Sequence, residues 1–252
     1  MTLYDLHLHR CTDRADLGDH AGRRAADLLG RALAEHGSAR VMLAAAPSQQ
    51  ATLAVLAASG LDFSRVEFFH MDDYLGLSPD APQGFGNWLQ TQFISLLDGP
   101  TTFHRMDVIS NDPSAAAQHY DDLMGVEPFD VTLCGLGVNG HLAFNDPPAR
   151  FDDPRGARVV ELDSVSRQQQ VDEGHFPDVD AVPSHAVTVT IPRLLNAHHV
   201  ICSVPGAEKR TAVTQTVTGA VDPMHPGTAL KTHPDVHLFV DAESAPLGTG
   251  DE

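Results

Sequence analysis

The sequence predicts an α/β fold, namely a single domain with a Rossmann-like, mostly parallel sheet and helices on both faces. Short apolar runs alternate with longer segments of helical periodicity from about residue 40 onward. Several runs are apolar at successive positions, as parallel strands buried on both faces are. The chain has 252 residues, of which 42% are hydrophobic and 20% charged, so it can bury most of its unfolded surface in one large domain. We therefore expect one domain that spans residues 1–252.

Seven apolar runs predict the strands of this sheet. They are residues 40–46, 66–70, 102–106, 130–137, 185–191, 199–204 and 235–240. The intervening segments predict helices, because they carry caps or apolar residues at helical spacing. Ser48 is placed to cap a helix over 49–59, and Pro113 opens one that reaches Leu123. Two further helices are predicted over 84–97 and 207–217.

Residues 146–184 are the one long stretch without a clear period. This segment is rich in Pro, Asp, Arg and Gln. A loop of that length inside a compact domain is usually functional. We therefore expect an irregular lid segment there.

The net charge restricts the partners that the protein can have. The sequence sets 16 Lys plus Arg against 34 Asp plus Glu, a formal charge of −18, and only Lys209 and Lys231 are lysines. A field of this sign repels nucleic acid and anionic membrane surfaces, and no basic cluster counters it. We expect no nucleic-acid or membrane partner, and a small molecule as the ligand. A homo-oligomer is compatible with the sequence.

Targeting and redox signals are weak. The first ten residues, MTLYDLHLHR, have no basic region followed by an apolar core, and no stretch approaches the ~18 apolar residues of a membrane span. A cytoplasmic location is therefore expected. Cys11, Cys134 and Cys202 show no CxxC spacing, and the last two lie in apolar runs. They are predicted to be buried thiols rather than a disulfide or a zinc site.

The segment DVTLCGLGVNGHLAFNDPP (130–148) joins an apolar strand to three glycines. Gly135, Gly137 and Gly140 have the spacing of a dinucleotide-binding fingerprint. However, residues 145–148, Asn-Asp-Pro-Pro, stop the helix that should follow, and the acidic residue expected ~20 positions further on is missing. We favour a glycine-lined turn at the carboxyl end of a strand, where backbone amides can approach a ligand.

A histidine follows these glycines. His141 lies between Asn139 and Asp146, which can orient an imidazole as a general base requires. The alternative is a structural turn with a chance histidine, since the chain has 15 of them.

A second polar group follows the strand VEFFH (66–70). The strand ends with His70, and Asp72, Asp73 and Tyr74 follow within four residues. Two adjacent carboxylates among apolar residues repel each other and are desolvated, which raises a carboxyl pKa toward the range useful for proton transfer. The alternative is a solvated turn. His141 follows the end of a second predicted strand. The presence of proton-transfer groups at two strand ends favours a catalytic pocket over a solvated turn.

Two extended blocks carry a family resemblance. HMDDYLGLSPDAPQGFGNWLQTQF (70–93) resembles the block around the catalytic aspartate of glucosamine-6-phosphate deaminases, and GLGVNGHLAFNDPP (135–148) resembles the block that holds their catalytic histidine. The resemblance continues weakly through 185–213 and 230–239, and extends to the wider family of sugar-phosphate isomerases and 6-phosphogluconolactonases. It implies a divergent member of this family.

The resemblance implies a mechanism without a metal or an organic cofactor. His141 would open the sugar ring, and Asp72 would shuttle a proton between C1 and C2 of the open-chain sugar. The family has acidic residues that hold this histidine, and here their positions carry Asn139 and Asp146. Asn139 cannot stabilise an imidazolium by charge.

The resemblance also implies a set of contacts to a sugar phosphate. The family has a Gly-Gly-Thr/Ser phosphate cradle after its first strand, whereas this chain has AAAPSQQ over residues 44–50. Lys209 matches the family's phosphate lysine, and Arg167 is the nearest candidate for its phosphate arginine. The residues expected to contact the substrate are Ser48, Gln49, Asp73, Gly137, Gly140, Lys209 and Arg167.

Three other classes of function remain open. The first is sugar-phosphate hydrolysis of the 6-phosphogluconolactonase kind. The second is a metal-dependent amidohydrolase, because His7 and His9 form the HxH pattern on one face of a strand; that class needs an eight-fold barrel. An edge strand with solvent-facing histidines is the commoner reading of this pattern. The third is a non-catalytic sugar-phosphate binder, although such a protein would not need both Asp72 and His141.

Overall fold

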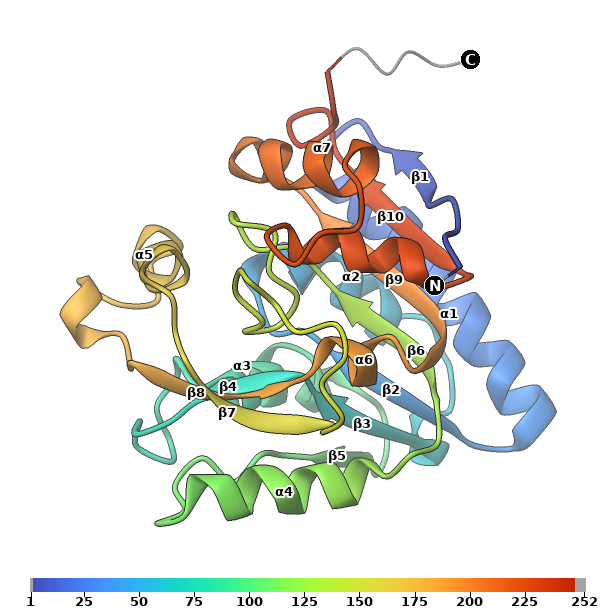
Figure 1. Cartoon of the computed structure of the whole chain (residues 1–252). Helices are drawn as coiled ribbons and strands as arrows, with labels where there is room; N and C mark the ends of the chain where they lie inside the picture. The colour runs from blue at the N-terminus through green and yellow to red at the C-terminus, as the bar shows by residue number, and fades with distance from the viewer. Residues whose placement is uncertain (1, 248–252) are drawn as a thin grey trace.

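The main sheet is parallel and open. The computed structural model of the chain describes residues 2–247 (Figure 1). Within this range, the order across the sheet is β1 (His7–Arg10), β10 (Val236–Val240), β9 (Ala197–Val204), β6 (Phe129–Cys134), β2 (Ala39–Leu43), β3 (Val66–His70) and β5 (Thr102–His104). Every neighbouring pair in this order is parallel. The prediction of an α/β fold on a mostly parallel sheet is therefore confirmed.

A small second sheet lies beside the main one. Its order is β4 (Asp72–Tyr74), β8 (His185–Val189) and β7 (Ala157–Glu161), and both pairings are antiparallel. The prediction that 185–191 belongs to the main parallel sheet was wrong. Four of the five residues of β8 are buried, and three of these four are apolar, so both faces of the strand are covered. An apolar run of this kind predicts burial and does not specify strand direction.

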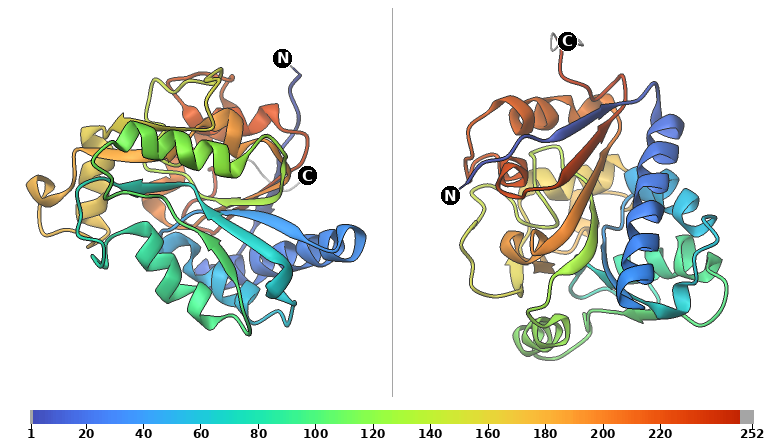
Figure 2. Two further views of the ribbon diagram at one scale, coloured as in Figure 1. Left: turned by 90° about the horizontal axis from the view of Figure 1, so that it is seen from below. Right: turned by 90° about the vertical axis from the view of Figure 1, so that its right-hand side faces the viewer.

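Helices cover both faces of the main sheet. The α-helices of residues 2–247 are α1 (Arg14–His36), α2 (Gln50–Ala57), α3 (Phe85–Gln92), α4 (Pro113–Met124), α5 (Ser164–Asp172), α6 (Ile191–Leu194) and α7 (Arg210–Thr218), of which α5 does not pack on this sheet. The right-hand view of Figure 2 shows α1 on one side of the strands and the orange segments near α7 on the other. Adjacent residues of one strand, such as Met42 and Leu43 of β2, enter two different hydrophobic clusters. This alternation is what a sheet with two covered faces requires.

The predicted helices are found, with shorter bounds in three cases. The segment predicted as 49–59 forms α2 over Gln50–Ala57, and the predicted cap by Ser48 was wrong, because no side chain caps α2 or the 3-10 turn before it. The segment predicted as 84–97 forms α3 and then a separate 3-10 turn at Ile94–Leu96. The segment predicted as 207–217 begins with a 3-10 turn at Ala207–Lys209, which leads into α7.

The first 40 residues contain a helix that the apolar pattern did not predict. Asp13 caps α1 by accepting hydrogen bonds from two backbone amides of its first turn. Gly18 of α1 lies against α2 so closely that a Cβ there would stand 2.3 Å from the Cβ of Ala51. Small residues on this face let the two helices approach, and they weaken the periodicity by which a helix is recognised.

Strand β1 is an edge strand of an open sheet, so the eight-fold barrel of the amidohydrolase hypothesis is excluded. His7 is exposed, and His9 is partly buried and stacks on Phe239 at 4.3 Å between ring centroids. His9 Nε2 lies 2.9 Å from Nδ1 of His237 on the neighbouring strand. The two histidines therefore lie on an edge strand, as the simpler interpretation of the HxH pattern predicts, but only His7 faces solvent.

Residues 146–184 are more ordered than predicted. They hold β7 and α5, and the latter is capped by Asp163, which accepts a hydrogen bond from Val165 N at 2.7 Å. In Figure 1, α5 stands apart from the main sheet, beyond the β4, β8 and β7 strands. The segment predicted as an irregular lid is thus a strand and a helix joined by turns.

The three cysteines are buried and unpaired. A hydrogen bond with Cys134, together with burial, raises the pKa of the Cys202 thiol well above its usual range. The prediction of buried thiols is confirmed. No helix within residues 2–247 is long and apolar enough to cross a membrane.

Candidate active site

A pocket lies at the carboxyl ends of β2, β3 and β6, and α5 borders it. It encloses about 520 Å³, counting the part open to solvent, which falls within the range of ligand sites. Six of the residues predicted for the site line it: Ser48, Gln49, Asp72, Gly137, His141 and Lys209. Five lie outside its lining: Asp73, Asn139, Gly140, Asp146 and Arg167. Segments distant in the sequence meet here because parallel strands end at the same edge of the sheet.

Asp72 begins β4 and presents its carboxyl group to the pocket. Its side chain is 7% exposed. Burial, followed by the charges of Asp73 and Asp146, raises the pKa of Asp72 well above its usual range. A carboxyl group with a raised pKa is suited to accept and return a proton near neutral pH.

His70 supports the backbone that carries Asp72. Its Nδ1 lies 3.0 Å from the carbonyl oxygen of Asp72, and its Nε2 accepts a hydrogen bond from Met106 N at 2.9 Å. This pair of contacts assigns the proton to Nδ1. Burial is the main cause that lowers the pKa of His70, which keeps the ring neutral. His70 is therefore a structural residue behind the site.

Asp73, which was expected to contact the substrate, points away from the pocket. Its side chain is 2% exposed. One carboxylate oxygen accepts hydrogen bonds from Tyr74 N (2.9 Å) and Phe85 N (2.8 Å), and the other accepts one from Gly86 N (2.9 Å). Asp73 thus fixes the first turn of α3, where a negative charge is also favoured by the helix dipole.

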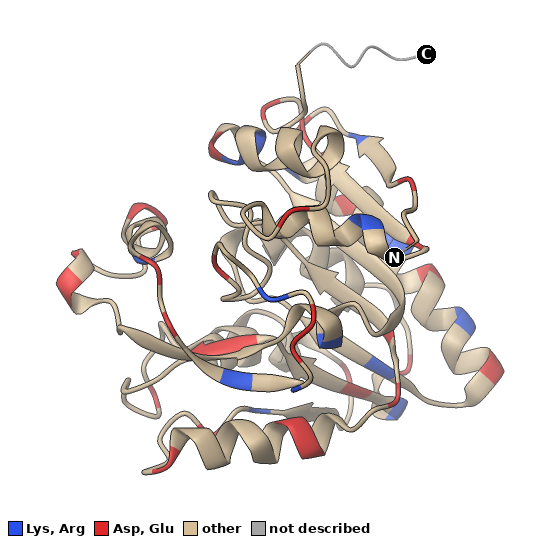
Figure 3. Ribbon diagram, in the orientation of Figure 1, with Lys and Arg blue, Asp and Glu red and all other residues tan. Residues whose placement is uncertain are grey.

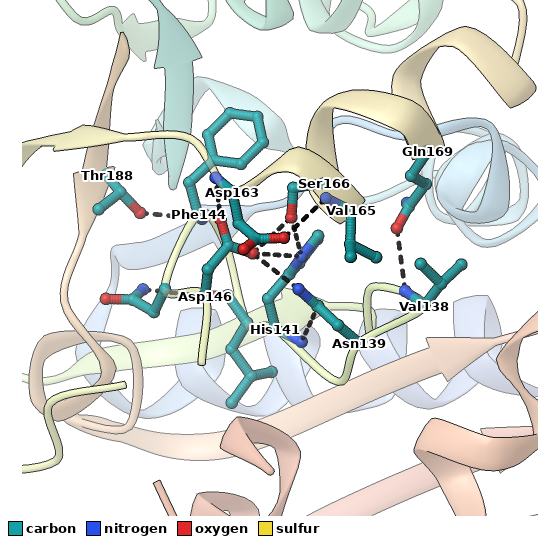
Figure 4. A network of polar contacts seen from close by, with 12 residues as sticks. Val138, Asn139, His141, Phe144, Asp146, Asp163, Val165, Ser166, Gln169 and Thr188 are labelled. Atoms are coloured by element: carbon teal, nitrogen blue, oxygen red, sulfur yellow. Dashed lines mark hydrogen bonds and ion pairs between the residues drawn. The ribbon is translucent and has the colours of Figure 1, made fainter. Parts of the chain in front are cut away.

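His141 forms a hydrogen-bonded group with Asp146 and Ser166 (Figure 4). Its Nδ1 lies 3.1 Å from Asp146 Oδ1 and 2.8 Å from Ser166 Oγ, and Ser166 Oγ donates a short hydrogen bond to the same carboxylate oxygen. We assign the imidazole proton to Nδ1, where Asp146 accepts it. The lone pair of Nε2 is then available to a ligand. The ring lies over Gly137, whose Cβ, if added, would stand 2.2 to 2.4 Å from three ring atoms.

Asn139 contacts Asp146 and the backbone of His141 rather than the imidazole ring. Its Nδ2 donates a hydrogen bond to Asp146 Oδ1 at 3.0 Å, and its Oδ1 accepts one from His141 N at 3.1 Å. Burial by itself raises the pKa of Asp146, but the hydrogen bonds and charge of His141 outweigh it, with help from Ser166 and Asn139. The pKa of Asp146 therefore lies well below its usual range. Asp163 N donates a hydrogen bond of 3.1 Å to the other carboxylate oxygen. The negative charge of Asp146 is therefore stabilised by four donors, which are His141, Ser166, Asn139 and the amide of Asp163.

Lys209 is another charged residue of the pocket lining. Its side chain is buried, and Nζ lies 3.5 Å from Glu173 Oε1. Burial lowers the pKa of Lys209, although the charges of Glu173 and Glu208 act in the opposite direction. Glu173 follows directly after α5 and was not among the residues that the sequence predicted.

The loop after β2 contributes small and neutral side chains. Gln49 is 2% exposed, and its Nε2 donates hydrogen bonds to Ser203 O at 3.0 Å and to Ser48 Oγ at 3.2 Å. A 3-10 turn at Pro47–Gln49 separates β2 from α2. Gln49 is therefore held in place by the protein and lines the pocket in that position.

Arg167 and Gly140, which were expected to contact the substrate, make structural contacts outside the pocket lining. Arg167 lies on α5, and its guanidinium donates hydrogen bonds to the carbonyl oxygens of Val179 and Val182, so it ties the helix to the following turn. Gly140 has a φ of 83° and donates its N–H to Gly137 O at 2.9 Å, so it closes the turn that precedes His141.

The polar face of α5 is the part of the site that the sequence analysis missed. Ser166, Gln169, Gln170 and Glu173 recur at intervals of three or four residues, and the last three line the pocket. Gln169 Oε1 accepts a hydrogen bond from Val138 N at 2.9 Å, and Gln170 Oε1 accepts one from the Tyr74 hydroxyl at 2.6 Å. The signal was present as a helical spacing of polar residues after the cap Asp163, rather than as an apolar stripe.

Comparison with known proteins identifies the family of the chain. The family model described as glucosamine-6-phosphate isomerases/6-phosphogluconolactonase matches residues 12–238. The chain belongs to this family. The match includes both strand ends that carry Asp72 and His141, together with α5 and Lys209.

Relatives of this family member share most of its length. A glucosamine-6-phosphate deaminase of Bacillus velezensis is 32% identical over 188 residues, which cover 74% of this chain and 76% of the relative. One of Streptococcus pneumoniae is 30% identical over 226 residues, which cover 90% and 94%. The resemblance inferred from the two sequence blocks is confirmed.

Solved structures of family members have the same fold. A monomeric glucosamine-6-phosphate deaminase superposes with a TM-score of 0.87 at 27% identity and covers 95% of this chain and 98% of that one. The 6-phosphogluconolactonase of Trypanosoma brucei superposes with a TM-score of 0.78 at 16% identity, with 96% and 98% covered. At that identity the second likeness concerns the fold alone.

Proposed function

We propose that this protein is an enzyme that isomerises an amino-sugar phosphate to a ketose phosphate and releases ammonia, an activity of the kind for which the relatives called glucosamine-6-phosphate deaminase are named. The observation that carries the proposal is that Asp72 and a carboxylate-held His141 line one pocket. Two proton-transfer groups on separate strand ends suit a reaction with two separate proton transfers. We also propose a cytoplasmic location, as expected from the sequence.

His141 would open the sugar ring. Its Nε2 takes the proton of the anomeric hydroxyl and delivers one to the ring oxygen, which breaks the C1–O5 bond and forms the aldehyde. The proton on Nδ1 stays with Asp146, which keeps the ring in the orientation that the step requires. Ser166 holds the carboxylate in that position.

Asp72 would then move a proton between two carbons. Its carboxylate removes the proton from C2, which gives a cis-enolamine, and the carboxylic acid returns a proton to C1. Hydrolysis of the resulting C2 imine consumes one water and releases ammonia, leaving the ketose. The raised pKa of Asp72 supports this role, because the group must act as base and as acid in turn.

The test measures proton exchange as well as product. The protein is incubated with a panel of hexosamines and hexosamine phosphates in D₂O, and NMR follows deuterium at C1 and C2 while ammonia and ketose are assayed. Asp72→Asn should abolish the exchange and keep ligand binding. The exposed Asp98 gives a matched control, because Asp98→Asn makes the same change in charge at a residue outside the pocket lining.

Three results would count against the proposal. Turnover of no panel member would remove the deaminase activity and leave the binding-protein alternative. Exchange that persists in Asp72→Asn would remove Asp72 as the base. Hydrolysis of 6-phosphogluconolactone, run beside the panel, would favour the other activity of the family if it were faster than ammonia release.

A further inference from the structure

The pocket has the features of an anion site, together with one carboxylate that opposes it. Ala45, Ala46 and Ser48 line the pocket, and their backbone amides have no hydrogen-bond partner within the part of the chain that the structure describes. Free amides and the ammonium group of Lys209 suit a phosphate monoester, which carries a charge of about −1.5 to −2 at neutral pH. However, the carboxylate of Glu173 lies 3.5 Å from that ammonium. A group with the same sign of charge as a phosphate therefore already occupies the contact that Lys209 offers.

Lys209 is buried so deeply that its charge needs a counterion. Its side chain is only 4% exposed. Burial is the main cause that lowers the pKa of Lys209, and the charge of Glu173 is the largest opposing cause. A buried ammonium group without a partner tends to lose its proton and thereby its attraction for an anion. Before a ligand arrives, Glu173 therefore helps to keep Lys209 charged and in place.

A second partner for the Glu173 carboxylate lies just beyond hydrogen-bond distance. Glu173 Oε2 is 3.7 Å from His175 Nε2. That nitrogen is buried, and among the described residues it has no hydrogen-bond partner. Gln169 Nε2 donates a hydrogen bond of 2.7 Å to the other oxygen, Oε1, and holds the carboxylate where it is. A movement of the carboxylate by about 1 Å toward His175 would give the buried nitrogen an acceptor and lengthen the contact with Lys209.

We propose that Glu173 is an exchangeable counterion. The phosphate of the substrate takes its place on Lys209, and His175 receives the displaced carboxylate. This inference rests on the proposed function, because it takes an amino-sugar phosphate as the ligand and assigns a specificity role within that same site.

The exchange selects a ligand that carries two negative charges. A phosphate dianion is attracted to the ammonium group more strongly than a single carboxylate is, and it also gains hydrogen bonds from the free amides. An unphosphorylated sugar has no group that can replace the carboxylate, so it leaves the ion pair between Lys209 and Glu173 intact. Glu173 thus lowers the affinity for the phosphate while it keeps Lys209 ready to bind one.

Calorimetry measures the exchange without turnover. The ligands are 2-amino-2-deoxyglucitol and its 6-phosphate, which have no carbonyl group. The proteins are the wild type, Glu173→Gln, His175→Phe, the variant with both changes, and Asp172→Asn. The first change keeps the shape of the side chain without its charge, and the second keeps a ring without a hydrogen-bond donor. Asp172 is exposed and bonds to Gln168 on the same helix, so Asp172→Asn controls for a general change of charge.

Glu173→Gln should bind the phosphorylated glucitol about tenfold or more tightly than the wild type, because the competing charge is gone. His175→Phe should bind it about threefold or more weakly, because the displaced carboxylate loses its partner. In the Glu173→Gln background, where no carboxylate is displaced, His175→Phe should have no effect. The affinity for the unphosphorylated glucitol should change less than about twofold in every variant, and Asp172→Asn should leave both affinities unchanged.

Unchanged or weaker binding of the phosphorylated glucitol by Glu173→Gln overturns the inference. An equal effect of His175→Phe in both backgrounds does so too, because a purely structural role of His175 would produce it. If Glu173→Gln does not fold, His175→Phe decides alone, and an unchanged affinity for the phosphorylated glucitol overturns the exchange. Ammonia release from glucosamine 6-phosphate is assayed beside binding. Affinities that change as expected without ammonia release refute the proposed reaction and keep the exchange, whereas ammonia release with unchanged affinities refutes the exchange alone.

Discussion

Asp73→Asn separates a structural from a substrate-binding role for this carboxylate. Asparagine keeps the shape of the side chain, but one oxygen becomes an NH₂ group that faces a backbone N–H. If that oxygen is the partner of Gly86 N, a hydrogen bond of 2.9 Å is lost and a buried donor is left without an acceptor. Such a loss costs about 1–3 kcal/mol. Removal of the negative charge at the start of α3 adds about 0.3–1 kcal/mol.

The expected loss in the free energy of unfolding is therefore about 1.5–4 kcal/mol, measured by urea denaturation. The variant should remain folded at 25 °C, because domains are usually stable by about 5–15 kcal/mol. The charge of Asp73 also helps to raise the pKa of Asp72, so its removal should move the acidic limb of the kcat/KM profile to lower pH.

Two results would refute this reasoning. A loss below about 0.5 kcal/mol, which is the scale of ordinary surface substitutions, would mean that the three backbone contacts contribute nothing distinctive. A large increase in KM with unchanged stability would return Asp73 to the substrate-contact role that the sequence analysis assigned. Asp98→Asn serves as the control, because Asp98 is exposed.

Three further outcomes are expected. Gly137→Ala places a Cβ within 2.4 Å of the His141 ring, so the ring must shift. The value of kcat/KM for the substrate should then fall about 100-fold or more. An unchanged kcat/KM would mean that the ring can move without loss of activity. Ser166→Ala removes a hydroxyl that contacts both His141 and Asp146, so kcat should fall about tenfold or more in steady-state assays, with KM little changed. Burial lowers the pKa of His237 to about 4, below the unfolded value of about 6.5. As the pH falls through this window the unfolded chain gains a proton that the folded chain excludes, so the free energy of unfolding should fall more steeply in the wild type than in His237→Gln, and equal slopes in urea titrations would contradict this.

The sheet could be predicted because burial on both faces leaves a continuous apolar run. The strands β2, β3, β6, β9 and β10 all lie within or beside runs of this kind. The same reasoning misassigned β8, since a strand of a small antiparallel sheet is equally apolar when both of its faces are covered. The apolar pattern also missed α1, whose contact face toward α2 contains small residues such as Gly18 and Gly22 that give little periodic signal.

The part of the site that could be predicted is the part that follows the ends of strands. Asp72 and His141 follow strands of one parallel sheet, so their convergence could be inferred. Neighbouring residues of a strand point to opposite sides, and the sequence alone could not show that Asp72 faces the pocket while Asp73 faces α3. Asn139 was expected to orient the imidazole, whereas the second contact to the ring comes from Ser166, 25 residues away from His141 in the chain.

Helix α5 and the residue that follows it carry contacts to two different residues of the pocket lining, His141 and Lys209. Ser166 near its start contacts His141, and Glu173 directly after its end pairs with Lys209. Because one short helix carries both contacts, a shift of the helix at one end is transmitted to the other end. Residues in one rigid network show interaction energies of about 0.5–3 kcal/mol. The effects of Ser166→Ala and Glu173→Gln on kcat/KM should therefore be non-additive by at least about 0.5 kcal/mol. Strict additivity would mean that the two ends of α5 act independently.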